Sequence, residues 1–275
     1  MSASENTIDI LLLGNGGREH ALAAKLAASP LCGTLYIAPG NGGTLAVGEN
    51  VALDAEDSTA VADFARETGC GLVVIGPEAP LVAGVADAVR EAGIACFGPG
   101  AAGAQLEGSK RFSKELMARA GIPTAAYGSF TDEESALAYV REQGAPVVVK
   151  ADGLAAGKGV VVALTLDEAL DAVHGCFDGA FGDAGSTVVI EEMLTGPECT
   201  LLAFTDGKTV RPMATSQDHK RALEGDLGPN TGGMGVYSPV PIVTPEEHAE
   251  MCRILDETIA EANREGIDFR GCLYG

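Results

Sequence analysis

The sequence predicts an α/β protein in which a parallel, doubly wound sheet is followed by an α+β region. Strand and helix signals alternate through the first hundred residues, which is typical of a parallel sheet covered on both faces. Hydrophobic residues make up 46% of the 275 residues, aromatic residues make up 5%, and tryptophan is absent, so aliphatic side chains must form the cores. After about residue 102 the alternation is lost, and we expect a domain boundary there.

Four short apolar runs are the expected strands of the first region, and each is followed by a glycine-containing loop. They lie at residues 8–13, 35–38, 72–75 and 94–97. Apolar residues one helical turn apart predict the intervening helices, namely Leu22 and Leu26, then Val61 and Ala65, then Leu81, Val85 and Val89. Because ligands of such sheets bind at the carboxyl ends of the strands, we expect a ligand at these loops.

The second region mixes helices with β-branched strands. A helix is expected over 109–120, and Gly121 and Pro123 end it. Capping boxes at Thr131–Glu134 and Thr165–Glu168 predict two further helices, and Thr244 with Glu247 predicts a long one that ends near residue 266. Strands are expected at residues 146–150, 159–163, 187–192 and 272–274. Because the chain stops within the last of these, we expect it to be a fragment.

Charge and cysteine usage exclude several classes of function. Thirty-nine acidic and eighteen basic residues give a net charge of −21, which disfavours nucleic acid and anionic membranes as partners. The seven cysteines have neither zinc-ligand spacing nor a disulfide pattern. The N-terminus has no apolar signal segment, and no stretch is long enough to span a membrane. We therefore expect a cytoplasmic protein, and a monomer.

The first candidate site is a glycine-rich turn between a strand and a helix. It reads Gly14, Asn15, Gly16, Gly17, Arg18, Glu19, His20. A dinucleotide fingerprint fails here because Glu19 occupies the third glycine position, so the turn favours a monophosphate-sized anion, with a plain tight turn as the alternative. Gly40, Asn41, Pro77 and Glu78 follow neighbouring strands. Glu78 could meet a ribose hydroxyl or an amine, or be an exposed turn acid.

A second cluster combines lysines with a glycine loop and an acidic strand end. Its members are Lys150, Gly157, Lys158, Gly159, Glu191, Glu192, Met193, Leu194 and Glu198. A glycine loop flanked by lysines can fold over a triphosphate, and a strand edge can offer backbone groups to an adenine. Glu198 would then lie near ribose hydroxyls. A glycine hairpin with solvated lysines is the alternative.

The third cluster is a polar, glycine-rich stretch without helical periodicity, which we interpret as a long functional loop. It contains Asp218, His219 and Lys220, followed by Asn230, Thr231, Gly232, Gly233, Met234 and Gly235. The histidine and lysine could stabilise a transferring phosphoryl group or an acyl phosphate. A mobile surface loop is the alternative.

Taken in order, these strings resemble the glycinamide ribonucleotide synthetase (phosphoribosylamine–glycine ligase) family of the ATP-grasp superfamily. The strings that carry the resemblance are Gly14–His20, Pro39–Asn41, Gly76–Leu81, Gln105–Lys110, Lys150–Gly159, Gln217–Arg221 and Gly228–Gly235. The resemblance implies a Rossmann-like, pre-ATP-grasp domain over residues 1–102. It implies an incomplete ATP-grasp domain over 103–275, with a small subdomain at about 123–194.

The resemblance also implies the reaction and the roles of the residues. Glycine would take the γ-phosphoryl group of ATP, and the amine of 5-phosphoribosylamine would attack the resulting glycyl phosphate. The Gly14–His20 turn, Gly40, Asn41, Pro77 and Glu78 would hold phosphoribosylamine, and Lys110 would join the second cluster in holding ATP. Asp218, His219 and Lys220 would be catalytic, and residues 230–235 would close over the reacting groups.

The sequence departs from the family pattern in what it lacks. The Mg²⁺- or Mn²⁺-ligating Glu and Asn of the family, and its Arg-Phe-Gly-Asp-Pro-Glu signature, lie beyond residue 275, so we expect no metal ligands within this chain. Residues 1–275 alone are therefore predicted to be inactive. Two other functions are weighed against this one: an ATP-grasp ligase with different substrates, and a non-catalytic nucleotide-binding or scaffold module.

Overall fold

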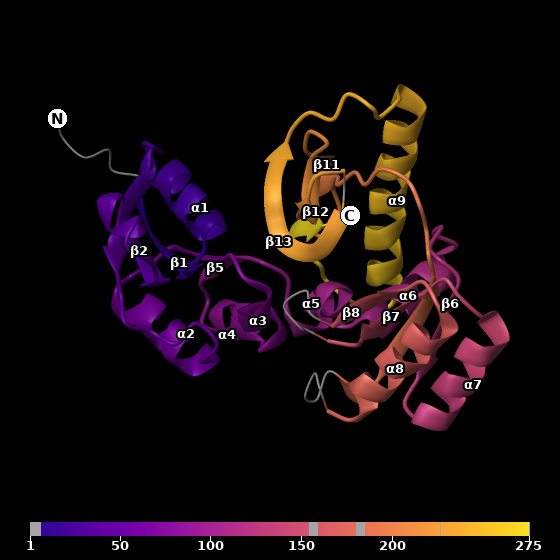
Figure 1. Cartoon of the computed structure of the whole chain (residues 1–275). Helices are drawn as coiled ribbons and strands as arrows, with labels where there is room; N and C mark the ends of the chain where they lie inside the picture. Colours follow the sequence, from indigo (N-terminus) through magenta and orange to yellow (C-terminus); the bar gives the residue numbers. More distant parts are fainter. Residues whose placement is uncertain (1–6, 154–158, 180–184, 226, 275) are drawn as a thin grey trace. The chain divides into compact units, whose positions relative to one another are not determined.

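A computed structural model describes residues 7–153, 159–179, 185–225 and 227–274 (Figure 1). The chain divides into two compact units, each described by itself below. Unit 1 comprises residues 1–105, 205–209 and 265–272, and unit 2 comprises 106–204, 210–264 and 273–275. In the part of the chain described, no helix is long and apolar enough to cross a membrane. Gly157 and Lys158 of the second cluster lie outside the described residues.

Unit 1 is built on a five-stranded parallel sheet in the order β3-β2-β1-β4-β5. Its strands are β1 (Ile8–Gly14), β2 (Cys32–Pro39), β3 (Glu49–Asn50), β4 (Leu72–Ile75) and β5 (Ala95–Phe97). The helices are α1 (Gly17–Ala27), η1 (Thr44–Ala46), α2 (Ser58–Glu67), α3 (Glu78–Val82), α4 (Val85–Glu91) and α5 (Ala101–Gly108). The prediction of a parallel, doubly wound α/β sheet is confirmed.

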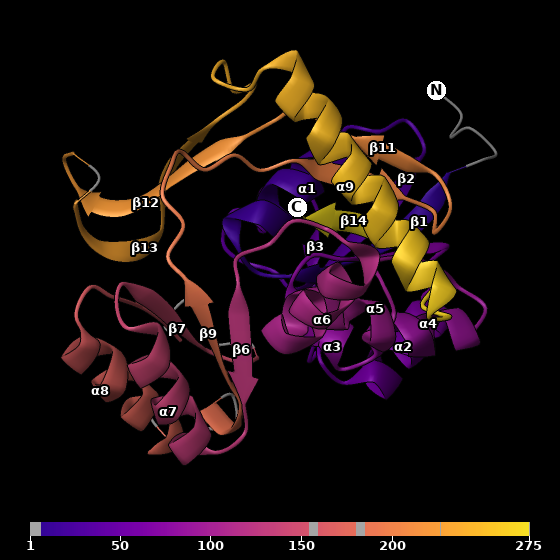
Figure 2. The same cartoon turned by 90° about the vertical axis from the view of Figure 1, so that its right-hand side faces the viewer.

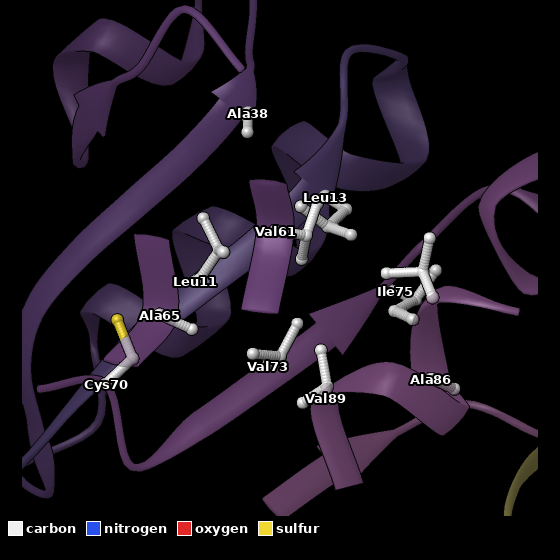
Figure 3. Packing of buried hydrophobic residues seen from close by; sticks show 11 residues of the cluster. Leu11, Leu13, Ala38, Val61, Ala65, Cys70, Val73, Ile75, Ala86 and Val89 are labelled. Atoms are coloured by element: carbon white, nitrogen blue, oxygen red, sulfur yellow. The ribbon is translucent and has the colours of Figure 1, made fainter. Parts of the chain in front are cut away.

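Alternate residues of β1 enter two different cores, because successive side chains of a strand point to opposite faces. Leu11 and Leu13 pack with residues of α2 and α4, such as Val61 and Val89, as Figure 3 shows. On the other face, Ile10 and Leu12 pack with Ala23 of α1 and with side chains of β2. The central strand is therefore covered on both faces, which is why it reads as a continuous apolar run.

Two details of unit 1 differ from the sequence expectation. The apolar positions 81–89 form two helices, since Gly84 has a φ of 83° and separates α3 from α4. The face of α1 is also rotated from the expected one: Leu22 is exposed, whereas Glu19 and Ala23 are buried. The pattern of apolar residues could not predict that the acidic side chain of Glu19 is buried.

Unit 2 contains a four-stranded antiparallel sheet in the order β6-β9-β7-β8. Its strands are β6 (Tyr127–Phe130), β7 (Val147–Ala151), β8 (Val160–Ala163) and β9 (Val188–Glu192). Helices α7 (Glu133–Gln143) and α8 (Leu166–Phe177) lie side by side against it in both views (Figures 1 and 2). Their buried side chains, including Val140 and Val173, form one core with those of the sheet, including Val149 and Ile190.

Helix capping in unit 2 follows the sequence at two of three places. The capping boxes Thr165–Glu168 and Thr244–Glu247 both form, each with reciprocal side-chain and backbone hydrogen bonds. The box predicted at Thr131–Glu134 is wrong, because Asp132 is the N-cap of α7 and accepts a hydrogen bond from the Ser135 N–H. Adjacent Thr and Asp residues both suit an N-cap, and the sequence pattern selected the wrong one.

The remaining elements of unit 2 are helices α6 (Lys110–Ala120) and α9 (Pro245–Arg264), which pack together, and five strands. Three form a sheet in the order β11-β10-β14, namely β10 (Leu202–Thr205), β11 (Val210–Pro212) and β14 (Gly271–Tyr274). The other two, β12 (Gln217–Leu223) and β13 (Leu227–Tyr237), form an antiparallel pair (Figure 2).

The β12–β13 pair corrects the interpretation of this stretch as a loop. Nearly all of β13 is exposed. Neither β12 nor β13 shows the alternation of apolar and polar residues that marks a half-buried strand, so the sequence pattern gave no strand signal. Backbone pairing holds it together, with irregular register between His219 and Arg221 and between Arg221 and Leu223. The Arg221 guanidinium also donates to the Gly228 carbonyl oxygen, at 2.7 Å.

Candidate functional site

The first group of candidate residues lies in unit 1, where β1 and β4 end. The Glu19 side chain is 4% exposed and accepts a hydrogen bond from the Gly16 N–H at 2.8 Å. The guanidinium group of Arg18 joins two carboxylates: its Nε lies 2.6 Å from Glu19 Oε1, and its Nη1 lies 3.0 Å from Glu78 Oε1. The structure therefore brings Arg18, Glu19 and Glu78 together, although Glu78 is distant in sequence.

Glu19 also explains the glycines around it. A Cβ atom at Gly14 would lie 2.7 Å from Glu19 Cδ, and one at Gly76 would lie 2.7 Å from Glu19 Cγ. Gly14 also has a φ of 126°, a conformation that favours glycine. The carboxylate thus occupies the space that these glycines leave, and it binds the N–H of Gly16 within the turn predicted to hold an anion.

Asn41 connects the loop after β2 to the turn after β1. Its Nδ2 donates to the Asn15 carbonyl oxygen at 2.9 Å, and its Oδ1 accepts from the Gly43 N–H at 2.7 Å. A Cβ at Gly43 would lie 2.6 Å from His20 Nδ1, so the His20 ring packs directly against this loop. Gly40 adopts a φ of 69°, and Pro77 is the N-cap residue of α3.

The contact between Arg18 and Glu78 favours the ionised form of both side chains. Burial would lower the pKa of Arg18, but its bonds to Glu78 and Glu19 outweigh burial and raise it. Burial would raise the pKa of Glu78, but the hydrogen bond and charge of Arg18 outweigh burial, so the pKa of Glu78 is lowered. One guanidinium thus faces two carboxylates, which gives this edge of the sheet acceptors for an amine or for hydroxyl groups.

The second group lies in unit 2 and centres on Glu191 of β9, whose side chain is 7% exposed. Lys150 on β7 donates to Glu191 Oε2 at 2.8 Å, and Lys114 on α6 lies 3.4 Å from the same oxygen. Lys110, one turn before Lys114, donates to the Gly153 carbonyl oxygen at 3.0 Å. Lys110, Lys114 and Lys150 are called the lysine cluster below.

Lys114 is the residue that sequence reasoning missed. Lys110 and Lys114 are four positions apart on α6 and therefore lie on one face of the helix, which was a usable signal. Burial lowers the pKa values of both lysines despite nearby carboxylates, and the charge of Lys150 acts in the same direction. Cations held this close together favour an anionic ligand with several charges.

The two neighbouring glutamates at the end of β9 have different surroundings. The Glu191 side chain faces the lysine cluster, whereas Glu192 is exposed. Met193 is half-buried and Leu194 is 68% exposed, and both follow the strand. The carbonyl oxygen of Gly159, the residue just before β8, accepts a hydrogen bond from the Ala151 N–H at 2.8 Å. The strand edge after Glu191 therefore has exposed groups next to a cationic cluster.

The third group lies on the β12–β13 pair. Lys220 donates to Glu198 Oε2 at 2.7 Å and lies 3.7 Å from Asp218 Oδ1. Burial would lower the pKa of Lys220, but the hydrogen bond to Glu198 outweighs burial, so the pKa of Lys220 is raised. His219 pairs in register with Gly235, and its ring centroid lies 5.7 Å from that of Tyr237. The structure thus links Glu198, predicted to touch ATP, with two residues predicted to be catalytic.

The glycine-rich part of β13 is placed against the same residues. Asn230 pairs with Arg221 through the backbone, and the Thr231 hydroxyl donates to the Lys220 carbonyl oxygen at 2.9 Å. Gly232, Gly233 and Met234 are exposed.

Among the residues described, no three His, Cys, Asp or Glu side chains form a group that could hold a metal ion.

Family models match almost the whole chain. The model for the phosphoribosylglycinamide synthetase N domain matches residues 8–107, and the model for the ATP-grasp (A) domain of the same enzyme matches residues 108–275. The phosphoribosylamine–glycine ligase of Brucella melitensis is 58% identical over 266 residues, and that of Vibrio parahaemolyticus is 58% identical over 272. Each alignment covers 96% of this chain, but the chain spans only 62% and 63% of the two relatives.

Solved structures agree with the sequence relatives. The phosphoribosylamine–glycine ligase of Thermotoga maritima superposes with a TM-score of 0.82 at 30% identity, covering 97% of this chain and 64% of that one. N5-carboxyaminoimidazole ribonucleotide synthetase of Thermus thermophilus has a TM-score of 0.67 at 22% identity, covering 96% and 66%, and shows a shared fold. With both domain models matched in order, the chain belongs to the phosphoribosylglycinamide synthetase family.

Proposed function

We propose that the whole protein, at the length of its relatives, is an ATP-dependent ligase that joins glycine to 5-phosphoribosylamine. The observation that carries the proposal is the lysine cluster around Glu191, a concentrated positive charge in a chain whose net charge is −21. A cationic cluster beside a strand edge suits a nucleoside triphosphate. The identity of 58% to two phosphoribosylamine–glycine ligases supports the choice of substrates.

In this proposal ATP binds to unit 2. Lys110, Lys150 and Lys158 contact the phosphates, and Gly157 and Gly159 let the backbone approach them. The strand edge formed by Glu192, Met193 and Leu194 binds the adenine through backbone groups, and Glu198 lies near the ribose. Mg²⁺ or Mn²⁺, when bound, neutralises phosphate charge during transfer.

Phosphoribosylamine binds to unit 1 in this proposal. The Gly14–His20 turn, Gly40, Asn41 and Pro77 surround it. The second carboxylate oxygen of Glu78 accepts from the ribose hydroxyls or the amine, while its first oxygen is held 3.0 Å from Arg18. Fixing one oxygen on Arg18 leaves the other oriented toward a ligand, which is the usual benefit of a preorganised site.

The reaction proceeds in two steps. A carboxylate oxygen of glycine attacks the γ-phosphorus of ATP, the bond to the β–γ bridging oxygen breaks, and ADP leaves. The amine nitrogen of phosphoribosylamine then attacks the carbonyl carbon of glycyl phosphate, loses a proton and displaces phosphate. Asp218, His219 and Lys220 would stabilise the charge that develops on the transferring group, and residues 230–235 would exclude water.

Each predicted domain has its own role in this proposal. Residues 1–102 would form the substrate-binding domain, and residues 103–275 would form the ATP-grasp domain with a small subdomain at about 123–194. We propose a cytoplasmic monomer whose ligands are ATP, glycine and phosphoribosylamine, with neither nucleic acid nor membrane as a partner.

The test is ADP release by the whole protein with magnesium, glycine and phosphoribosylamine, each omitted in turn. The Brucella melitensis ligase is the positive control. We expect ADP only when every component is present. ADP release with a different amine in place of phosphoribosylamine would assign other substrates to an ATP-grasp ligase, and ATP binding without turnover would indicate a non-catalytic module. The same assay on residues 1–275 tests the prediction that this length is inactive.

A further inference from the structure

The carboxylate of Glu191 is shared by two lysines that differ in exposure. Its Oε2 lies 2.8 Å from Lys150 Nζ and 3.4 Å from Lys114 Nζ. The Lys150 side chain is 26% exposed, whereas that of Lys114 is 10% exposed. Lys150 can therefore reach a ligand, and Lys114 approaches the same carboxylate from the interior.

Lys114 is held in place by more than its charge. Its Nζ donates to Thr124 Oγ1 at 2.7 Å and to the Ala125 carbonyl oxygen at 3.3 Å. The same nitrogen lies 5.5 Å from the centre of the Tyr127 ring. With its donors used by neighbouring protein groups, Lys114 is not free to move out and bind a ligand itself.

The net charge beside the ligand depends on Lys114. Two ammonium groups and one carboxylate leave a net charge of +1 at the Lys150–Glu191–Lys114 group. Without Lys114, the Lys150–Glu191 pair would be neutral, and the carboxylate would offset the charge that Lys150 presents to phosphates. Charge interactions at this range are strong because the group is largely shielded from water.

We propose that Lys114 is a positioning residue for the nucleotide phosphates: it balances Glu191 from the interior so that Lys150 keeps its positive charge for the ligand. The inference rests on the proposed ATP site and adds a residue that the proposal does not use. Glu191 itself then fixes the direction of Lys150 instead of contacting the nucleotide.

A purely structural role predicts different behaviour. If Lys114 only anchored residues 124 and 125, its removal would weaken binding of ATP and ADP equally and would depend on the loss of stability. If Lys114 supplies charge, its removal weakens binding of the more highly charged ATP more than that of ADP. Removing the Glu191 charge as well would then restore binding.

The experiment measures ATP and ADP binding to the whole protein by titration calorimetry, without glycine or phosphoribosylamine, and thermal unfolding of each variant is recorded in parallel. Lys114→Met should weaken ATP binding about tenfold and ADP binding less. Lys114→Met combined with Glu191→Gln restores the net charge of +1 and should recover most of the ATP affinity. Glu191→Gln alone keeps a side-chain oxygen that can accept from Lys150 and leaves both lysine charges, so it should bind ATP at least as tightly as the unsubstituted protein. Lys25→Met, on an exposed face of α1, removes one charge from unit 1 and should change neither affinity.

The outcomes separate this inference from the proposed function. If the unsubstituted whole protein binds no ATP, the proposed nucleotide site is wrong and this inference falls with it. If the unsubstituted protein binds ATP and Lys114→Met binds it equally well, the role of Lys114 alone is contradicted. Equal losses for ATP and ADP without recovery in the double variant would also overturn it, and would leave Lys114 as a structural anchor.

Discussion

Arg18 and Glu78, which follow different strands of the parallel sheet, form an ion pair with 3.0 Å between Nη1 and Oε1. Because β1 and β4 are neighbours, their carboxyl ends bring the two residues to one edge of the sheet. Glu19 holds the other side of the same guanidinium at 2.6 Å. The position of Glu78 therefore depends on a chain of contacts that begins with a buried carboxylate.

Replacing Arg18 tests whether that contact serves phosphoribosylamine. In the whole protein, Arg18→Gln should raise the KM for phosphoribosylamine about tenfold or more, because Glu78 loses the partner that orients it. The KM for ATP should stay unchanged, since the lysine cluster lies in the other unit. Steady-state kinetics with each substrate varied in turn measures both values. An equal rise in both KM values would show that Arg18 supports the fold and not one site.

Replacing Glu19 tests its structural role. Glu19→Ala should lower the free energy of unfolding by about 1–3 kcal/mol, because the Gly16 N–H and the Arg18 guanidinium lose a buried acceptor. Glu19→Gln keeps an acceptor of the same shape and should cost less. Urea unfolding followed by circular dichroism compares the two variants. An alanine variant as stable as the unsubstituted protein would contradict the role given to Glu19.

Acid should weaken the fold through Glu78. Its pKa is lowered from 4.5 because the Arg18 bond outweighs burial, so the unfolded chain binds the proton more readily than the folded one. The stability that Glu78 contributes is present above about pH 4.5 and is lost as the pH falls through its folded pKa. Glu78→Gln should therefore show a smaller loss of urea midpoint between pH 6 and pH 3.5. Identical pH profiles for the two proteins would contradict the ion pair.

Cys96 should be unreactive in the folded protein. Burial raises its pKa from 9.0 to about 11, so its thiolate fraction near pH 8.5 is on the order of a hundredfold smaller than in the unfolded chain. Peptide mass spectrometry after brief iodoacetamide treatment, with and without urea, measures the ratio. Equal labelling of Cys96 in both conditions would mean that the fold does not shield the thiol from the reagent.

Local patterns predicted those parts of the fold that depend on neighbours in sequence. The runs 8–13 and 72–75 read as buried strands because β1 and β4 are covered by helices on both faces. Thr165 with Glu168 predicted a helix start because a capping box is a contact within one turn. The β12–β13 pair was missed because backbone hydrogen bonds, and not a buried face, hold it together.

The candidate sites were predicted unequally for the same reason. The Gly14–His20 turn could be proposed from the sequence because a strand–turn–helix motif has a local signature. Lys114 was missed because its partner, Glu191, comes from a strand far along the chain. The burial of Glu19 was also missed, since its acidic side chain reads as a surface group until the glycines at 14 and 76 are seen to surround it.

The central claim is that glycine is activated as glycyl phosphate before it meets the amine. The most direct measurement uses the whole protein with glycine labelled by ¹⁸O in its carboxylate, and analyses the released phosphate by mass spectrometry. Because the attacking carboxylate oxygen leaves with the phosphoryl group, each phosphate should carry one ¹⁸O atom. Phosphate without ¹⁸O, formed together with the amide, would contradict the account.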